Sequence, residues 1–196
     1  MILRDDGWGV SQTAHSALAG RLAEAWAIDD DLPAQDLRTA ATIHDIGWTE
    51  WEQHPPPDPP PFYALPAAEH AVIWTKGTDE AATFGRWVGL LVSLHCTRLM
   101  GWRIERGHST PEIDALVARE QERQRVLRAG LDDDVVERAS ALIATWDGLS
   151  LKLCGGETPE LDPWPFTRDH VPLHVDARPL DGSAGGRTLD VSLYRS

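Results

Sequence analysis

The sequence has few lysines, few cysteines and no long apolar run. Lysine occurs only at Lys76 and Lys152, and 31 acidic residues outnumber 18 basic ones, which gives a formal net charge of −13. Nucleic acids and anionic membrane surfaces attract positive charge, so this balance argues against both as partners. No apolar run reaches the roughly 20 residues of a membrane helix, and the first ten residues do not resemble a signal peptide.

The two cysteines, Cys96 and Cys154, form no CxxC pair. Such isolated cysteines are typical of small buried hydrophobic residues in a reducing compartment, so we expect a cytoplasmic protein. A chain of 196 residues can bury one core, and 42% hydrophobic residues with 25% charged ones is typical of a globular protein. We predict a single domain over 1–196, with a helical core at about 11–154 and a β-rich C-terminal appendage at about 155–196.

Hydrophobic periodicity predicts a mainly helical fold. Apolar residues recur at helical spacing in segments 12–27, 33–47, 67–75, 79–100 and 111–129, and again after the acidic residues at 132–134. Gly47 is expected to end the second helix, and Gly77 to separate the third from the fourth. Alternating apolar residues at 1–10, 171–175 and 189–193 predict short hairpins, which could pair into a small β appendage built from both ends of the chain.

A proline-rich segment interrupts the helical pattern at residues 54–66. It holds half of the chain's 14 prolines, which predicts a stiff extended loop. Trp48, Trp51, Phe62 and Tyr63 lie near it in the sequence. A packed loop, a loop over a site and a recognition motif for a partner domain remain open interpretations, and Trp48 and Trp51 could line a pocket.

Several histidines and aspartates occur at apolar positions within the predicted helices. Adjacent side chains on a helix diverge by about 100°, so an inward-facing His44 and Asp45 need a shared partner such as a metal ion. Imidazole together with carboxylate suits Zn, Fe, Mn or Ni better than Mg or Ca. The alternative is a structural core histidine beside a surface aspartate. The full ordered set is His15, His44, Asp45, His70, His95 and Asp147. Five antiparallel helices would bring these side chains to one centre, where six ligands suit two metal ions with Asp45 bridging.

This ordered set resembles the signature of the HD-domain superfamily of metal-dependent enzymes. A first His, a His-Asp pair and a final Asp match the signature, and the two further histidines match its two-metal branch. The segments SQTAHSALAGRLAEAW, IHDIGW, LLVSLH and WDGLSLKLC are also similar to an uncharacterised bacterial HD-like family, over about residues 10–165. The resemblance implies an HD-like helical bundle. It assigns His15, His44 and Asp147 to one metal and His70 and His95 to the other.

The resemblance also implies an activity, that of a metal-dependent hydrolase acting on a small molecule, with a phosphoester as one substrate class. A hydroxide activated by the two metals, Fe or Mn first and Zn or Ni as alternatives, would attack the substrate, with Asp45 as the catalytic residue. An HD-type di-iron oxygenase acting on a small organic substrate and a non-catalytic metal- or ligand-binding module remain open, as does a homodimer.

Substrate contacts are predicted one turn from candidate ligands, at Gln12 and Arg98. Many HD enzymes carry Lys or His where this chain has Trp48, so a positive group for phosphate is missing there, and Arg98 or Lys152 could substitute. Glu69 or His54 could replace His70 as a ligand. The other histidines lie in loop or strand segments and are predicted to be on the surface: His54, His108, His170 and His174.

Overall fold

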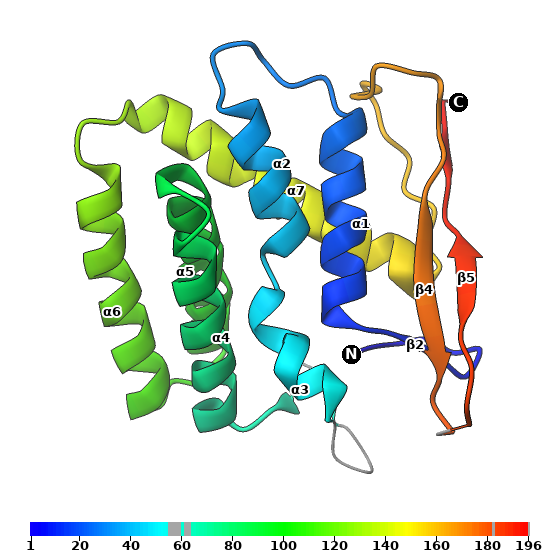
Figure 1. The fold of residues 1–196 in the computed structure, drawn as a ribbon, viewed down its shortest axis with the longest axis horizontal. Helices are drawn as coiled ribbons and strands as arrows, with labels where there is room; N and C mark the ends of the chain where they lie inside the picture. The colour runs from blue at the N-terminus through cyan, green and yellow to red at the C-terminus, as the bar shows by residue number, and fades with distance from the viewer. Residues whose placement is uncertain (55–59, 61–63, 182, 196) are drawn as a thin grey trace.

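A computed structural model describes residues 1–54, 60, 64–181 and 183–195, and shows a mainly helical protein with small antiparallel sheets (Figure 1). Five helices lie side by side: α1 (Gln12–Ala25), α2 (Ala34–Ile43), α4 (Ala67–Ala82), α5 (Arg86–Glu105) and α6 (Pro111–Arg128). A sixth, α7 (Asp133–Gly155), crosses behind α2 and α1 (Figure 1). The predicted mainly helical fold is confirmed, but α7 is not antiparallel to its neighbours.

Local sequence signals set where several helices begin and end. The Ser11 side chain accepts a hydrogen bond from a backbone N–H at the start of α1, and Thr110 and Asp132 do the same for α6 and α7. Each such cap stabilises a helix by about 1 kcal/mol. Helix α7 is followed by Gly156 as its C-terminal cap, whose φ of 92° is a conformation that favours glycine.

Two glycines predicted as helix boundaries instead lie at a close contact. Helix α2 ends at Ile43, before Gly47, and α4 continues through Gly77, so both boundary predictions are wrong. The break before α5 lies at Gly85, where φ is 130°. Gly47 belongs to a 3-10 turn, η1 (Ile46–Trp48), which leads into the short helix α3 (Thr49–Gln53). A Cβ on Gly47 would lie 2.2 Å from a backbone oxygen of α4, and one on Gly77 would lie 3.0 Å from the Gly47 nitrogen. The two glycines therefore let η1 pack closely on α4.

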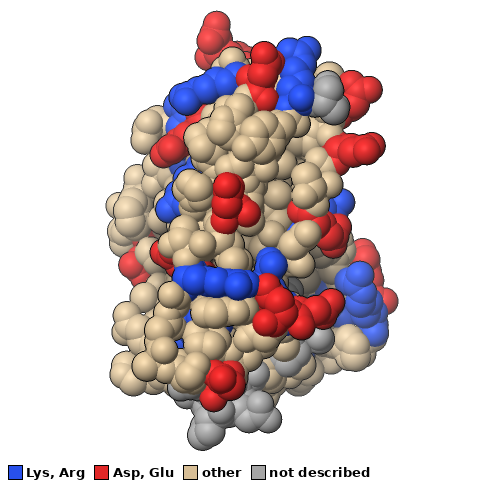
Figure 2. Space-filling model, turned by 90° about the vertical axis from the view of Figure 1, so that its right-hand side faces the viewer, with Lys and Arg blue, Asp and Glu red and all other residues tan. Residues whose placement is uncertain are grey.

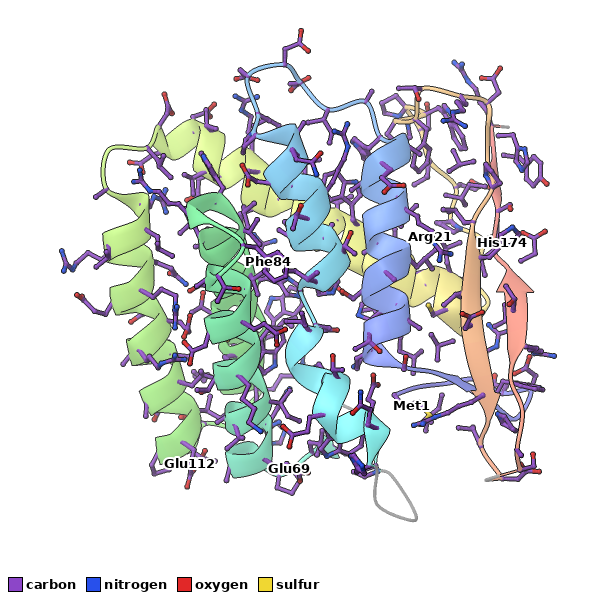
Figure 3. The ribbon with its side chains drawn as sticks, viewed as in Figure 1. Met1, Arg21, Glu69, Phe84, Glu112 and His174 are labelled. Atoms are coloured by element: carbon purple, nitrogen blue, oxygen red, sulfur yellow. The ribbon has the colours of Figure 1, made fainter. Side chains whose placement is uncertain are left out.

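Both ends of the chain contribute to one antiparallel sheet of order β1-β2-β4-β5. The strands are β1 (Ile2–Leu3), β2 (Trp8–Val10), β4 (His174–Pro179) and β5 (Arg187–Asp190), while β3 (His170–Val171) pairs separately with β6 (Leu193–Tyr194). The register places Val10 opposite Ala177, which confirms the predicted pairing of the two ends. The sheet runs alongside α1, from which Arg21 donates a hydrogen bond to the backbone carbonyl of His174 (Figure 3).

Helices and strands share one main hydrophobic core. Leu18 of α1, Trp146 of α7, Val175 of β4 and Leu193 of β6 are all buried in the same cluster. Cys154 belongs to this cluster and Cys96 to a smaller one between α4, α5 and α6, so both cysteines are buried as predicted. The β appendage therefore completes the helical core rather than forming a second one.

Figure 2 shows acidic and basic side chains scattered over a largely uncharged face on the side of β4 and β5. Across the sheet, for example, Arg187 pairs with Asp6 at 2.6 Å. In the parts of the chain that the structure describes, none of the helices has both the length and the apolar character to cross a bilayer. Most of the proline-rich segment, including Phe62 and Tyr63, lies outside the described residues, and so do the predictions made for it.

Candidate metal centre

Five of the six predicted ligands converge in the protein interior. His15 lies on α1, His44 and Asp45 at the junction of α2 and η1, His95 on α5 and Asp147 on α7. All five are buried. The ring centroids of His15 and His44 lie 5.0 Å apart, and those of His44 and His95 lie 4.9 Å apart. Four elements distant in sequence therefore bring three imidazoles and two carboxylates together.

The adjacent residues His44 and Asp45 both face this centre because the α-helix ends between them. His44 keeps α conformation, whereas Asp45 has φ −105° and ψ 21° before η1 begins. Successive side chains diverge by about 100° only while the backbone stays helical, so the change at Asp45 removes that constraint. The His44 ring is held in place by its Nδ1, which donates to the Ala41 carbonyl at 2.8 Å.

Four donor atoms form a closed ring at the centre. His15 Nε2 lies 2.8 Å from Asp45 Oδ2 and 3.8 Å from Asp147 Oδ1. His44 Nε2 lies 3.7 Å from the same Asp45 oxygen and 3.5 Å from the same Asp147 oxygen. Donors that share one ion at about 2.1 Å lie roughly 3.0–3.4 Å apart in octahedral or tetrahedral geometry. The measured edges, 2.8 to 3.8 Å, lie on both sides of this range, so the ring is close to the dimensions of a metal site.

Hydrogen bonds determine which ring nitrogen of His15 and His44 is free. The Ser150 hydroxyl donates to the Asp147 carbonyl at 2.8 Å, so it accepts from Nδ1–H of His15, also at 2.8 Å. Nδ1–H of His44 is likewise used on the Ala41 carbonyl. In the neutral rings both Nε2 atoms then point lone pairs at carboxylate oxygens, a repulsive arrangement that either a second proton on each ring or a metal ion between the donors removes. Metal-binding histidines typically have such a partner on the other nitrogen, so these residues fit a metal ion.

The electrostatics of the cluster also favour a cation. Burial disfavours the charged His44 ring, but the Asp45 and Asp147 carboxylates outweigh it and raise its pKa to about 9. Burial disfavours the Asp147 carboxylate as well, yet the hydrogen bond from His44 and the nearby His95 hold its pKa well below the ordinary value. The pKa of Asp45 is lowered in the same way by His44 and His15, against the effect of burial. Two ionised carboxylates in the interior thus require positive charge beside them, which either protons or a metal ion can supply.

His95 supplies a further donor that is not otherwise used. Neither of its ring nitrogens has a hydrogen-bond partner among the described residues, although buried polar atoms nearly always have one. Its Nε2 lies 3.9 Å from Asp147 Oδ2, and burial lowers the pKa of His95 to about 4, which keeps the ring neutral. Within the described chain, the donor groups that could hold an ion are His15–His44–Asp45 and His44–His95–Asp147. These two groups share His44.

His70 lies beside the cluster and belongs to neither donor group. Its Nε2 accepts a hydrogen bond from the Trp74 indole at 3.0 Å, so its proton is on Nδ1 and the ring offers no lone pair in this orientation. Its ring packs against Trp48 with centroids 5.6 Å apart. The expected division, with His70 and His95 on a second metal, is therefore not the grouping that the geometry gives. The alternatives His54 and Glu69 are exposed, and Glu69, in the first turn of α4, accepts from the Trp51 indole at 2.5 Å (Figure 3).

A cavity of about 590 Å³ opens onto the cluster, within the size range of small-molecule sites. Its inner wall includes His15, Asp45, His95 and Asp147. Apolar and aromatic side chains form the middle: Trp48, Trp74, Leu99, Met100 and Leu151. Toward the end of α5 the wall contains Trp102 and three basic residues, Arg103, Arg106 and His108. The cluster is thus accessible to a small molecule.

The predicted substrate contacts lie at different places relative to this cavity. Gln12 lines it, and its buried Oε1 has no partner among the described residues. Arg98 lies outside the described wall and donates instead to Ser140 Oγ on α7 at 3.1 Å. Along α5 the wall is formed by residues about one, two and three helical turns after His95, namely Leu99, Arg103 and Arg106. Arg103 and Arg106 were missed, but stepping along the helix by whole turns from His95 would have found them.

The structure also locates the two tryptophans predicted to line a pocket and the four histidines predicted to be on the surface. Trp48 lines it, whereas Trp51 packs on Trp48 with centroids 5.7 Å apart and is not part of the described wall. His54, His170 and His174 are exposed, as predicted. His108 is exposed as well, but it lies in the cavity wall.

The fold and the cluster define a mainly helical protein with buried His and Asp groups that could hold a metal ion. The chain belongs to the family described as protein of unknown function (DUF3891), whose model matches residues 1–162. No curated protein and no solved structure matches the chain. The matched range contains every residue of the cluster and of the cavity wall, and it ends before β3.

Proposed function

We propose that this protein is a metal-dependent hydrolase with an HD-like set of ligands, acting on a small molecule. The observation that carries the proposal is the pair of Nε2 atoms of His15 and His44, which face two carboxylates at the end of an accessible cavity. Phosphoesters are the first substrate class to test, because a metal ion in this cluster would place positive charge in an otherwise acidic protein.

The residues of the cluster would divide between two ions in this proposal. The four residues of the ring would hold one ion: His15, His44, Asp45 and Asp147. His95, whose Nε2 faces the other oxygen of Asp147, would contribute to a second ion. A metal ion held there supplies a hydroxide nucleophile at neutral pH by lowering the pKa of its bound water. Asp45 would be a donor common to both imidazoles, because one of its oxygens faces both His15 and His44. The Ser150 hydroxyl and the Ala41 carbonyl hold the two imidazoles in place.

The cavity contributes binding and the exclusion of water. Its tryptophan, leucine and methionine side chains would surround the apolar part of a substrate, and a site closed to bulk water strengthens every electrostatic contact inside it. Gln12 would accept a hydrogen bond from the substrate, since its Oε1 has no partner among the described residues.

Metal content tests the proposal most directly. We expect protein purified without chelator to contain about one to two equivalents of Fe, Mn, Zn or Ni. The variants His44→Ala and Asp45→Ala should lose this metal, because each removes a shared donor. His174→Ala serves as the control, since this histidine is exposed on β4 and should leave the metal in place. Full metal content in both cluster variants contradicts the proposal.

Turnover experiments then separate the activity classes. Hydrolysis of an aryl phosphodiester or a nucleotide with Mn²⁺, in the absence of O₂, is the expected result. Asp45→Asn should abolish this hydrolysis while preserving the size and shape of the side chain. Substrate loss that requires iron and O₂ would instead identify an oxygenase, and bound metal without turnover of any ester would indicate a binding module.

A further inference from the structure

Arg103 stands in the cavity wall without an acidic partner among the described residues. By contrast Arg123, which also lies between helices, pairs with Glu120 at 3.1 Å and also contacts Asp79. The Arg103 Nη2 instead makes a long contact of 3.5 Å to the Leu65 carbonyl, and its Nε is buried with no partner in the described part of the chain. A half-buried guanidinium in a protein of net charge −13 is thus left with unused donors.

Such a guanidinium is suited to a small anion. Its planar donors match the two oxygens of a carboxylate or a phosphate, and the loss of hydration on burial is offset when an anion binds. Arg106 and His108 lie in the same part of the wall, and the Arg106 side chain has only a backbone carbonyl, that of Trp102, as a partner among the described residues. Among the described residues, the basic end of the cavity therefore has several donors but no acid.

An apolar region lies between this basic end and the cluster. Along α5 the wall passes from His95 through Leu99 to Arg103, two turns or about 12 Å of helix rise. Because helical side chains lean toward the N-terminus, the guanidinium reaches back over part of that distance. The space that remains, flanked by Trp48 and Trp74, fits a body of about one aromatic ring.

From this layout we infer that the substrate is a small organic anion with three parts: a carboxylate or phosphate bound by Arg103, an apolar ring-sized body, and a separate scissile bond at the His95 and Asp147 end. This inference rests on the proposed function for the scissile bond. The assignment of Arg103 as the anion-binding residue concerns binding alone and can be tested without turnover.

Tryptophan fluorescence measures this binding directly, because Trp48, Trp74 and Trp102 line the cavity. Benzoate and phenylphosphonate, which resist hydrolysis, are titrated into the purified protein before and after chelation, and benzyl alcohol serves as the uncharged analogue. We expect Arg103→Gln to bind both anions at least about tenfold more weakly, with benzyl alcohol binding unchanged. Arg103→Lys keeps the charge but not the planar fork, and should bind with intermediate affinity.

Arg125→Gln is the matched control, because it removes the same charge from an exposed position on α6. Anion binding that is equal in Arg103→Gln and wild type, or equally weakened in Arg125→Gln, overturns the inference. Weaker binding of benzyl alcohol to Arg103→Gln also overturns it, since the effect would then be on cavity shape. If the tenfold difference appears in a protein that hydrolyses no ester, the hydrolase proposal fails while Arg103 remains the anion-binding residue.

Discussion

The Ser150 hydroxyl decides which nitrogen of His15 faces the cluster. Ser150→Ala removes the acceptor of Nδ1–H, so the ring can rotate or carry its proton on Nε2, where it would block a metal. We expect metal affinity to fall about 10- to 100-fold, the usual effect of removing a hydrogen bond that orients a ligand. Competition with a chromophoric chelator measures the change.

Ser140→Ala provides the control for that prediction. Ser140 lies on the same helix and is also buried, but its hydroxyl contacts Arg98 rather than a member of the cluster. Its metal affinity should equal that of the wild type. A Ser150→Ala protein that binds metal as tightly as Ser140→Ala would show that the hydroxyl does not orient His15.

The two cysteines link burial to reactivity. Burial raises the pKa of Cys154 to about 12 and raises the pKa of Cys96 as well. The unfolded value is about 8.5, so the neutral thiols favour the folded state below that pH, and this contribution is lost as the pH rises toward the folded values. At pH 8 a thiol reagent should label neither cysteine in the native protein and both in guanidinium. Rapid labelling in native buffer contradicts the burial of these thiols.

At the scale of the elements, the sequence predicted helix positions better than helix ends. A repeat of 3.6 residues reports which face meets the core, and this is a local property of α1, α5 and α7. Gly47 and Gly77 were misassigned because their role is a contact between two elements, which a local pattern does not contain. The crossing of α7 depends on packing in the same way.

The candidate ligands were predictable as a set but not in their grouping. An imidazole or carboxylate on an apolar helix face needs a partner, which marked His15 and Asp147. Which ligands lie together depends on the backbone turn at Asp45 and on the crossing angle of α7. Neither can be predicted from the spacing of residues in the sequence. For His70 a local signal existed: Trp74 is four residues further along the same helix, within reach of its Nε2.

The close approach of η1 to α4 positions Asp45 and can be tested at Gly47. Gly47→Ala would place a methyl group 2.2 Å from a backbone oxygen of α4, so η1 must move. We expect the free energy of unfolding to fall by about 1–3 kcal/mol, the range for overpacking, and metal affinity to fall with it. Urea unfolding and metal titration measure the two effects.

Gly101→Ala is the matched substitution in a helix where nothing obstructs the added methyl group. It should be neutral or stabilise the protein by up to about 1 kcal/mol, because alanine favours helix over glycine. If Gly47→Ala is as stable as Gly101→Ala, the contact between η1 and α4 does not constrain the site.

At the scale of the whole molecule, the family match ends at residue 162 but the hydrophobic core does not. Beyond that point Val171, Leu173, Val175 and Leu193 are buried in the main cluster with α1 and α7. Burial of such side chains contributes about 1.5–3 kcal/mol each, so four approach the roughly 5–15 kcal/mol by which a typical domain is stable. We therefore expect a chain truncated after residue 168 to lose its cooperative thermal transition, as measured by circular dichroism.

Neighbouring residues on β6 allow the same point to be tested without truncation. Leu193 is 1% exposed and packs in the main core, whereas Tyr194 is 66% exposed and stacks only on His170 in the described part of the chain. Leu193→Ala should lower the free energy of unfolding by about 2–5 kcal/mol, since it leaves a cavity in the core, and Tyr194→Ala should lower it by less than about 1 kcal/mol. Equal stabilities, or a fully cooperative truncated chain, would mean that the helices hold the metal centre without the strands. Because α1 carries His15 and packs against both the sheet and α7, we expect Leu193→Ala also to weaken metal binding more than Tyr194→Ala does.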